Sequence, residues 1–180
     1  MWENHCIETC SKLNINLITE SIEIKVDGGG LESASRKARY RVFEKILNAG
    51  DQLLLGHHSD DVAETLFMRL LRGTGPDGME GPKLQRSLGK GVLIRPFLEI
   101  SKKQILDYLN INNIDYIEDD SNLSNDFDRN YLRNEIFPML ERKWNNFPNR
   151  INNFSKIIKD RNNSYSYLMH EKYNDLITNS

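Results

Sequence analysis

The densest group of chemically useful side chains lies at residues 57–65, which read HHSDDVAET. The group follows the apolar run 53–55, so it lies where a strand buried on both faces is expected to end and a helix to begin. At such a sheet edge α/β proteins bind ligands, and a helix N-terminus there offers unpaired N–H groups. Asp61 and Glu64 share one helical face, with His58 close enough to join them. This cluster could hold a divalent cation through its oxygens or bind an ammonium group.

A helix cap is the alternative for the same residues. With Ser59 or Asp61 as N-cap and Glu64 at the third position, much of the pattern arises with no chemistry at all. The adjacent His-Asp ligand pair of metal-dependent phosphohydrolases does not fit, because Ser59 separates His58 from Asp60. The cap and the ligand site both stay open at this point.

Several arginines could contact an anion. Arg69 and Arg72 stand beside the glycine-rich loop 73–78, which suits contact with phosphate or RNA backbone but lacks the Lys-Ser/Thr ending of a P-loop. Arg36 and Arg39 share one face of a basic helix. For the loop, an ordinary surface connection stays equally open, and for the basic helix a solvated face is the simpler interpretation.

Two further arginines, Arg129 and Arg133, lie one helical turn apart after the acidic loop 118–120. An ion-paired corner joining two subdomains is the default interpretation of that arrangement.

The periodicity of apolar residues predicts the elements that position these side chains. Helices are expected at residues 2–13, 33–47, 60–71 and 101–109, and strands at 15–26, 52–56, 92–94 and 115–117. A turn is expected at residues 28–30, and a capping box pairs Ser101 with Gln104. The alternation predicts an α/β fold with a doubly wound, mostly parallel sheet. From residue 128 the pattern is wholly helical, with Pro138 ending or kinking one helix.

Composition narrows the classes of protein. The 180 residues include 24 Lys and Arg against 26 Asp and Glu, which excludes nucleic-acid binding by bulk charge alone. The charge nevertheless alternates in patches, such as the basic stretch 36–45 and the acidic stretch 115–128, so a local nucleic-acid face stays open. Cys6 and Cys10 are expected to be small buried residues on one helix. No long apolar run or signal sequence is present, and we expect a cytoplasmic protein.

Taken in order, these stretches resemble the tRNA(Ile)-lysidine synthetases, a family of the PP-loop ATP pyrophosphatase superfamily. The matching blocks are residues 2–10, 32–40 (ESASRKARY), 55–65 (LGHHSDDVAET), 69–82 (RLLRGTGPDGMEGP), 94–105 (IRPFLEISKKQI) and 118–140.

The resemblance implies ATP-dependent ligation of lysine to the wobble cytidine of tRNA(Ile) with a CAU anticodon. ATP adenylates the base and releases pyrophosphate, and the lysine amine then displaces AMP. The implied cofactors are ATP and Mg²⁺; the implied partners are tRNA(Ile) and L-lysine, with no membrane and with a homodimer of the full-length protein. By position, the implied site residues are Asp61 and Glu64 for catalysis, Asp61 also for Mg²⁺, Arg39 and His58 for ATP, and Arg36, Arg69, Arg72, Arg95, Arg129 and Arg133 for tRNA or phosphate.

Two family motifs have no counterpart in this sequence: the pyrophosphate loop SGGxDS and the His-x-Asn-His segment. We therefore expect an N-terminally truncated chain that makes no lysidine alone. Residues 1–127 would be a partial PP-loop ATP-binding domain, similar to the adenine nucleotide alpha hydrolases but lacking the first strand and the phosphate loop. Residues 128–180 would be a helical segment that begins the next domain.

Two alternatives differ in chemistry. The first is a related PP-loop enzyme that thiolates tRNA, although such enzymes generally use Cys-x-x-Cys pairs and Cys6 and Cys10 are one residue too far apart. The second is a non-catalytic tRNA-binding remnant that uses the basic stretches 36–41 and 69–72.

Overall fold

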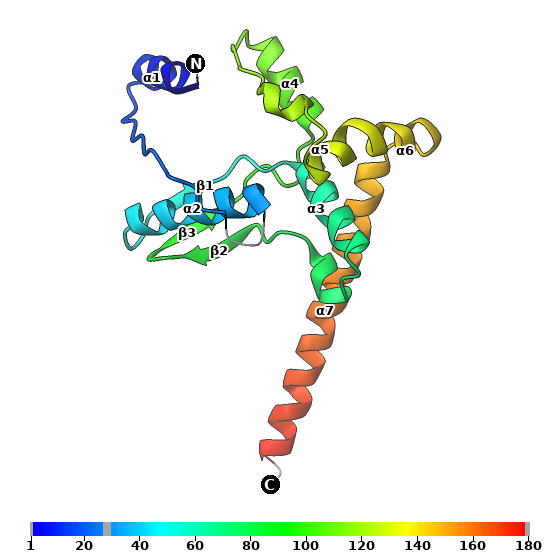
Figure 1. The fold of residues 1–180 in the computed structure, drawn as a ribbon. Coiled ribbons are helices and arrows are strands. Elements are labelled where there is room, and N and C mark those ends of the chain that lie inside the picture. The colour runs from blue at the N-terminus through cyan, green and yellow to red at the C-terminus, as the bar shows by residue number, and fades with distance from the viewer. Residues whose placement is uncertain (1, 27–29, 179–180) are drawn as a thin grey trace. The chain divides into compact units, whose positions relative to one another are not determined.

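The computed structural model describes residues 2–26 and 30–178. Helices and a small mixed sheet come first along the chain, and a wholly helical part follows (Figure 1). The chain divides into two compact units. The sheet unit comprises Met1–Leu54 with Gln85–Ile94, and the helical unit comprises Leu55–Leu84 with Arg95–Ser180.

The sheet unit holds three strands in the order β1-β3-β2. β1 (Gln52–Leu54) pairs parallel with β3 (Gly91–Ile94), and β2 (Gln85–Leu88) pairs antiparallel with β3. A two-residue turn joins β2 to β3, and Gly89 in that turn has a φ of +56°, a conformation that glycine adopts without steric cost. Leu93, in the central strand, is fully buried.

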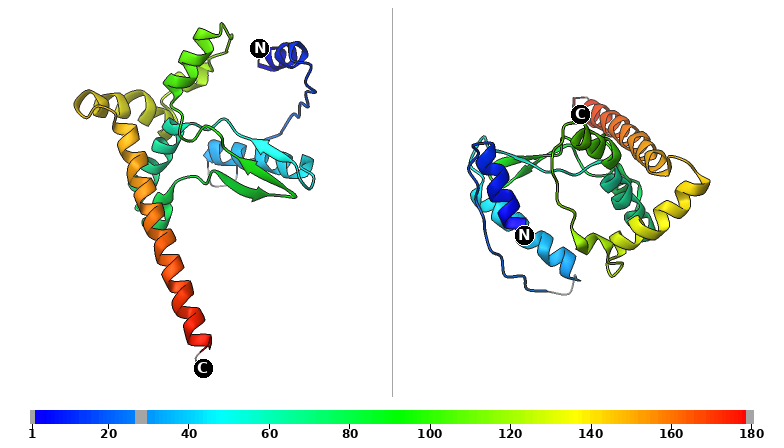
Figure 2. Two further views of the ribbon diagram at one scale, coloured as in Figure 1. Left: turned by 180° about the vertical axis from the view of Figure 1, so that it is seen from behind. Right: turned by 90° about the horizontal axis from the view of Figure 1, so that it is seen from above.

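Two helices complete the sheet unit, α1 (Trp2–Lys12) and α2 (Gly30–Ile46). Both views of Figure 2 show α2 beside the sheet. The end of α2 approaches the hairpin so closely that a Cβ atom at Gly89 would lie 3.0 Å from the carbonyl oxygen of Glu44. Glycine at position 89 is therefore favoured for two reasons, the positive φ of the turn and the close packing against α2.

The helical unit is built around two long helices, α3 (Ser59–Leu71) and α7 (Phe147–Thr178). The other elements are the 3-10 helix η1 (Pro76–Glu80), α4 (Lys102–Ile111), the 3-10 helix η2 (Asp120–Leu123), α5 (Asp128–Tyr131), the π-helical turn η3 (Leu132–Ile136) and α6 (Phe137–Lys143). The apolar face of α3 is buried against them at Val62, Ala63 and Leu66.

Two apolar clusters form the core of the helical unit. One contains Val62, Leu66 and Met79, with Ile151 of α7 packed against it. The other contains Ala63, Leu132 and Phe137 and extends into a group of three phenylalanines, Phe67, Phe137 and Phe147. The ring centroids of these phenylalanines lie 5.5–5.9 Å apart in edge-to-face arrangements, the geometry that aromatic pairs prefer.

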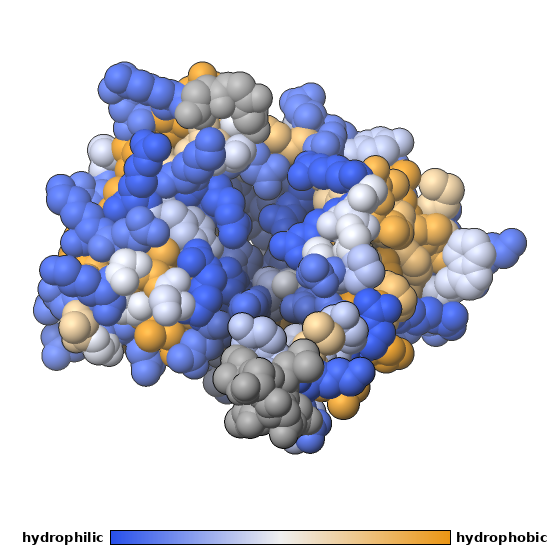
Figure 3. Space-filling model, turned by 90° about the horizontal axis from the view of Figure 1, so that it is seen from below, coloured by the Kyte–Doolittle hydropathy of each residue, from blue (hydrophilic) through white to orange (hydrophobic). Residues whose placement is uncertain are grey.

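An apolar groove of about 540 Å³ remains open on the helical unit, along α3, α6 and α7. Apolar side chains gather on that side of the molecule, at the right of the view in Figure 3. The groove is lined by Leu66, Phe67, Leu70, Met79, Leu140, Trp144, Phe147, Arg150, Ile151 and Phe154.

The predicted helices are confirmed at 2–12, 30–46, 59–71 and 102–111, and the chain is helical from residue 128 onward. The capping box at α4 is also confirmed: the Gln104 N–H donates to Ser101 Oγ at 3.2 Å, and the Ser101 N–H donates to Gln104 Oε1 at 2.9 Å. Helix α6 continues through Pro138, directly after the π-helical turn. The expected division at residue 128 stays a prediction.

Two strand predictions are wrong. Residues 15–26 and 115–117 lie in irregular backbone, because a strand needs a partner and within 2–26 and 30–178 the sheet consists of β1, β3 and β2. The prediction that the 53–55 run is buried on both faces is also wrong, since β1 is an edge strand and Leu54 is 62% exposed. β2 was missed, because its sequence QRSL has no apolar alternation.

Neither cysteine is buried. Cys6 is exposed and Cys10 is partly exposed on α1, a helix with no buried residue, so the expectation of two small core residues is wrong. The predicted glycine turn at 28–30 lies mostly outside the described residues, since only Gly30 is described. In the described part of the chain, no helix has both the length and the apolar character needed to cross a bilayer.

Candidate functional site

The first turn of α3 is fixed from several directions. His58 is its N-cap residue, and the His58 N–H donates to Asp61 Oδ2 at 3.0 Å. Ser59 is buried; its N–H donates to the carbonyl oxygen of Ile100 at 2.9 Å, and its own carbonyl oxygen accepts from Asn152 Nδ2 of α7 at 2.9 Å. A cap is present, but its predicted residues are wrong: the N-cap is His58 rather than Ser59 or Asp61, and the third position is Asp61 rather than Glu64.

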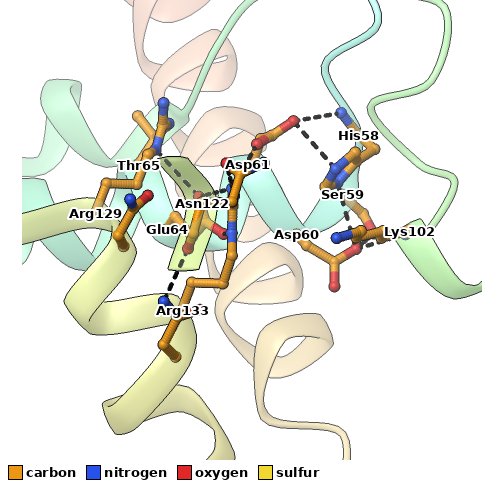
Figure 4. A network of polar contacts seen from close by, with 12 residues as sticks. His58, Ser59, Asp60, Asp61, Glu64, Thr65, Lys102, Asn122, Arg129 and Arg133 are labelled. Atoms are coloured by element: carbon orange, nitrogen blue, oxygen red, sulfur yellow. Dashed lines mark hydrogen bonds and ion pairs between the residues drawn. The ribbon is translucent and has the colours of Figure 1, made fainter. Parts of the chain in front are cut away.

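Asp60 links the starts of two helices. Its Oδ2 accepts a hydrogen bond of 2.8 Å from the backbone N–H of Lys102, the first residue of α4, and lies 3.5 Å from His58 Nδ1 (Figure 4). The interaction with His58, helped by the Lys102 N–H, lowers the pKa of Asp60 from 3.8 to about 2 although partial burial opposes the shift. Asp60 therefore stays ionised at the edge of the site.

Glu64 lies at the centre of the cluster, with 2% of its side chain exposed. Arg133 donates to both of its oxygens, from Nε to Oε1 at 2.6 Å and from Nη2 to Oε2 at 2.8 Å. Arg129 adds a third contact, Nε to Oε2 at 3.1 Å, and donates from Nη2 to Thr65 Oγ1 at 2.8 Å. A buried carboxylate needs this pairing, and the two-point contact with Arg133 is the strongest form of it.

Arg133 also reaches the second carboxylate of the pair. Its Nη2 lies 3.3 Å from Asp61 Oδ1, so one guanidinium joins Asp61 to Glu64. Burial disfavours the charged form of Arg133, but the hydrogen bonds and charges of Glu64 and Asp61 outweigh that effect and raise its pKa. Asp61 is 17% exposed and lies 3.5 Å from His58 Nε2. Asp61 and His58 thus keep a small exposed fraction, whereas Glu64 is almost completely buried.

From the sequence, we expected Arg129 and Arg133 to form an ion-paired corner with the acidic loop 118–120 before them. In the structure they pair instead with the carboxylates of α3, and Asp119 of that loop caps its own turn by accepting from the Ser121 N–H at 2.9 Å. The corner is ion-paired, as expected, but its acids come from a segment more than sixty residues earlier. A π-helical turn begins at Leu132, beside Arg133, a feature often found at functional sites.

The other predicted arginines have different surroundings. Arg95 is only 5% exposed and donates to His57 Nδ1 at 3.2 Å and to the Lys83 carbonyl oxygen at 2.7 Å. Arg69 donates to the Gly78 carbonyl oxygen at 2.6 Å and so holds the glycine loop. Arg72 is 71% exposed and lies 4.0 Å from Asp128. Of these three, Arg72 is the one whose charge faces solvent, and their predicted contacts with tRNA or phosphate stay predictions.

Arg36 and Arg39 lie on α2 in the sheet unit, and both are exposed. The structure brings His58, Asp61, Glu64, Arg129 and Arg133 into one cluster of the helical unit. Sequence reasoning missed Lys102 and Asn152, which act through a backbone N–H and a side-chain amide. Neither residue carried a signal, because an ordinary lysine and one asparagine among many give no pattern.

The described side chains do not form a metal cage by themselves. Within residues 2–26 and 30–178, no group of three or more His, Cys, Asp and Glu side chains is placed to hold a metal ion. Both oxygens of Glu64 are taken by arginine, and each oxygen of Asp61 has a partner, His58 N–H or Arg133. At most, Asp61 could share a cation with ligand phosphates, as single carboxylates do for Mg²⁺.

A family of known proteins matches the part of the chain that contains this site. The family model described as the PP-loop domain matches residues 1–140, most of the chain and all of the clustered residues. The chain belongs to the PP-loop domain family. Among solved structures, this PP-loop chain is similar to the U34-tRNA thiolase NcsA from Methanococcus maripaludis, described with its 4Fe–4S cluster. The TM-score is 0.58 at 16% identity, over 87% of this chain and 55% of that one, and such a likeness shows the fold alone.

Curated relatives are more similar in sequence. The PP-loop chain is 42% identical over 144 residues to the tRNA(Ile)-lysidine synthase of Coxiella burnetii, covering 79% of this chain and 32% of the relative. It is 40% identical over 155 residues to that of Pseudomonas putida, 86% of this chain and 35% of the relative. It is 37% identical over 176 residues to that of Buchnera aphidicola, 98% of this chain and 39% of the relative. The chain thus spans 32–39% of the length of these relatives.

Proposed function

We propose that this PP-loop chain is part of a tRNA(Ile)-lysidine synthase, an ATP-dependent ligase that modifies tRNA. The observation that carries the proposal is its identity of 37–42% with proteins of that name over 79–98% of the chain. The substrates would be ATP, L-lysine and tRNA(Ile), and the reaction would join the lysine amine to an adenylated wobble cytidine. Such tRNA chemistry takes place in the cytoplasm, and we propose that location for the protein.

The clustered residues suit recognition of lysine. Asp61 is partly exposed and negatively charged, so its carboxylate can accept hydrogen bonds from an ammonium group of the substrate. Glu64 is enclosed by two arginines and is better suited to position Arg133, and through it Asp61, than to touch a ligand. We therefore propose Asp61 as a lysine contact and Glu64 as a positioning residue.

The nucleotide and the tRNA need positive charge. His58 stands at the N-terminal end of α3, where a phosphate would also meet the helix dipole, and we propose it with Arg39 for ATP. Arg72, an exposed arginine at the end of α3, is proposed for the tRNA backbone. Mg²⁺ would arrive with the phosphates of ATP, with Asp61 as its one protein carboxylate.

Thiolation of tRNA is the less suitable function. The chain has two cysteines, both on α1 and four residues apart, and the likeness to the thiolase extends to the fold alone. Sulfur transfer by a Cys-x-x-Cys pair needs two cysteines three positions apart, and this sequence has no such pair.

Two measurements test the proposed function. The first is ATP-dependent incorporation of radiolabelled L-lysine into tRNA(Ile) with a CAU anticodon, which we propose the chain does not perform alone; incorporation would support the function and contradict that proposal. The second is calorimetric binding of L-lysine to the purified chain, wild type and Asp61→Asn. We expect Asp61→Asn to weaken lysine binding about tenfold or more, as the loss of a charged hydrogen bond does.

The matched control for this test is Asp128→Asn, which removes the same charge from a side chain that is 81% exposed. It should leave lysine binding unchanged. If the wild-type chain neither binds lysine nor incorporates it, or if the two variants behave alike, Asp61 is not a lysine contact. Incorporation of sulfur rather than lysine would favour the thiolase alternative.

A further inference from the structure

Two arginines of the sheet unit lie over one tyrosine ring. The guanidinium carbon of Arg36 is 4.9 Å from the centroid of Tyr40, and that of Arg86 is 5.2 Å from the same centroid. Arg36 and Tyr40 are one turn apart on α2, whereas Arg86 comes from β2, the strand that sequence reasoning did not predict. The group therefore exists only because the β2–β3 hairpin lies beside α2.

The tyrosine holds two like charges close together. Since each guanidinium is about 5 Å from one centroid, the two cannot be much more than ~10 Å apart, about the distance over which 0.1 M salt screens charges. Stacking on an aromatic face stabilises each cation, but the two cations still repel each other. An anion that contacts both would remove that repulsion.

The hydrogen bonds of both guanidiniums go to neutral groups. Arg36 Nη2 donates to Tyr40 Oη at 3.3 Å, and Arg86 Nη1 donates to the Ser87 carbonyl oxygen at 3.1 Å. A guanidinium has five N–H donors, so these bonds leave donors on each edge for a ligand. A planar edge with two adjacent N–H groups matches the oxygens of a phosphate.

The surroundings of the pair are basic and accessible. Arg36 is exposed, Tyr40 and Arg86 are half-buried, and Arg39 and Arg41 are exposed on the same helix. A polyanion could therefore make several contacts along α2 and β2 of the sheet unit, whereas a single phosphate ion would use only the central pair.

We propose that Arg36, Tyr40 and Arg86 form a binding platform for the phosphate backbone of RNA, in which Tyr40 holds the two guanidiniums in place. The proposal rests on the proposed function, because that function requires the chain to approach tRNA. It adds Arg86 and Tyr40, and it makes the hairpin β2–β3 part of the RNA-binding surface. Tyr40 is a positioning residue here, since it orders the arginines rather than contacting phosphate.

The test is binding of fluorescently labelled tRNA(Ile) to the purified chain at several salt concentrations. Arg86→Ala and Arg36→Ala should each weaken binding about fivefold to tenfold and reduce the slope of log K against log salt by about 1. Tyr40→Leu keeps both charges and removes the ring; it should weaken binding about threefold with little change in slope, a pattern that loss of charge would not give.

The matched control is Lys103→Ala, which removes one exposed charge from α4 of the helical unit. It should change binding less than twofold, and all variants should keep the thermal midpoint of the wild type. Equal effects of Arg86→Ala and Lys103→Ala would overturn the platform while leaving the proposed function intact. A wild-type chain that binds no tRNA would overturn both.

ATP serves as a second ligand in the same experiment, because its triphosphate offers the same chemistry as an RNA backbone. If Arg86→Ala weakens binding of ATP but not of tRNA, the pair belongs to a nucleotide site and the RNA assignment is wrong. Weaker binding of tRNA with unchanged ATP binding is the expected result.

Discussion

At the residue scale, Glu64 determines what its neighbours can do. Its buried carboxylate holds Arg129 and Arg133, and Arg133 in turn holds Asp61. Asp61 keeps a small exposed fraction and Glu64 is almost completely buried, a difference that the sequence does not show. Two arginines share three contacts with Glu64, so loss of either arginine leaves the negative charge of this buried carboxylate only partly paired, in a site that water reaches poorly.

Arg133→Ala should therefore lower the free energy of unfolding by about 3 kcal/mol, because Glu64 loses both of its short hydrogen bonds and keeps only Arg129. Urea denaturation followed by circular dichroism measures the change. Arg72→Ala is the matched control, since its exposed pair with Asp128 is expected to contribute less than about 0.5 kcal/mol. Equal losses in the two variants would show that the Glu64 cluster does not stabilise the helical unit.

A second prediction at this scale concerns pH. The pKa of Asp60 is about 2 in the folded chain against an ordinary 3.8, chiefly because of His58. Since the folded value is the lower one, ionised Asp60 adds stability that is fully present above about pH 4 and is lost as the pH falls toward 2. The stability difference between wild type and Asp60→Asn should shrink steadily across this range. A difference that stays constant between pH 5 and pH 2 would contradict the assignment.

At the scale of elements, the sequence predicted helices better than strands. α2 and α3 repeat apolar residues at helical spacing, and the capping box of α4 is a local signal, so each could be predicted without knowing its neighbours. A strand depends on a partner: the alternating residues 15–26 have none in the described chain, while QRSL of β2 pairs with β3 without alternating.

The same reasoning explains how much of the site could be predicted. His58, Asp61 and Glu64 belong to one helix turn, so their grouping follows from spacing. The partners of Glu64 come from residues 65 and 69 positions later, and the nearer acids 118–120 offered a more obvious pairing for Arg129 and Arg133. Long-range pairing of this kind depends on packing that no local pattern contains.

Gly91 tests the packing of the sheet. A Cβ atom there would lie 2.7 Å from the carbonyl oxygen of Asp51, at the junction of β3 with the residue before β1. Gly91→Ala should lower the free energy of unfolding by about 1–3 kcal/mol, as overpacking does. Gly75→Ala is the control, because its φ of −77° suits alanine and nothing lies within 4 Å of the added atom. Thermal melts that agree for both variants would mean that β1 and β3 are not packed so tightly.

At the scale of the whole molecule, the helical unit leaves apolar surface in contact with solvent. The groove along α3, α6 and α7 is lined mainly by aromatic and aliphatic residues, and Trp144 and Phe154 on it are about half exposed. Patches of this kind usually bind other apolar groups.

A hydrophobic dye should report this groove. Wild-type chain is expected to enhance the fluorescence of anilinonaphthalene sulfonate in its folded state, and Phe154→Ser should reduce the enhancement at least twofold because Phe154 lines the groove. Ile157→Ser is the control: it removes another exposed apolar side chain of α7 that is outside the lining. If both variants bind the dye as the wild type does, the dye binds elsewhere.

The hydrogen bond from Asn152 to Ser59 joins residues 93 positions apart, and it has a consequence for synthesis of the chain. At roughly 5–20 residues per second, a ribosome needs on the order of 5–20 s to make the intervening segment. During that interval α3 has left the ribosome while the helix that covers its apolar face, α7, has yet to be made. Val62 and Leu66 are then open to chaperones and to aggregation, so the speed of translation between residues 59 and 152 should affect the yield of folded protein.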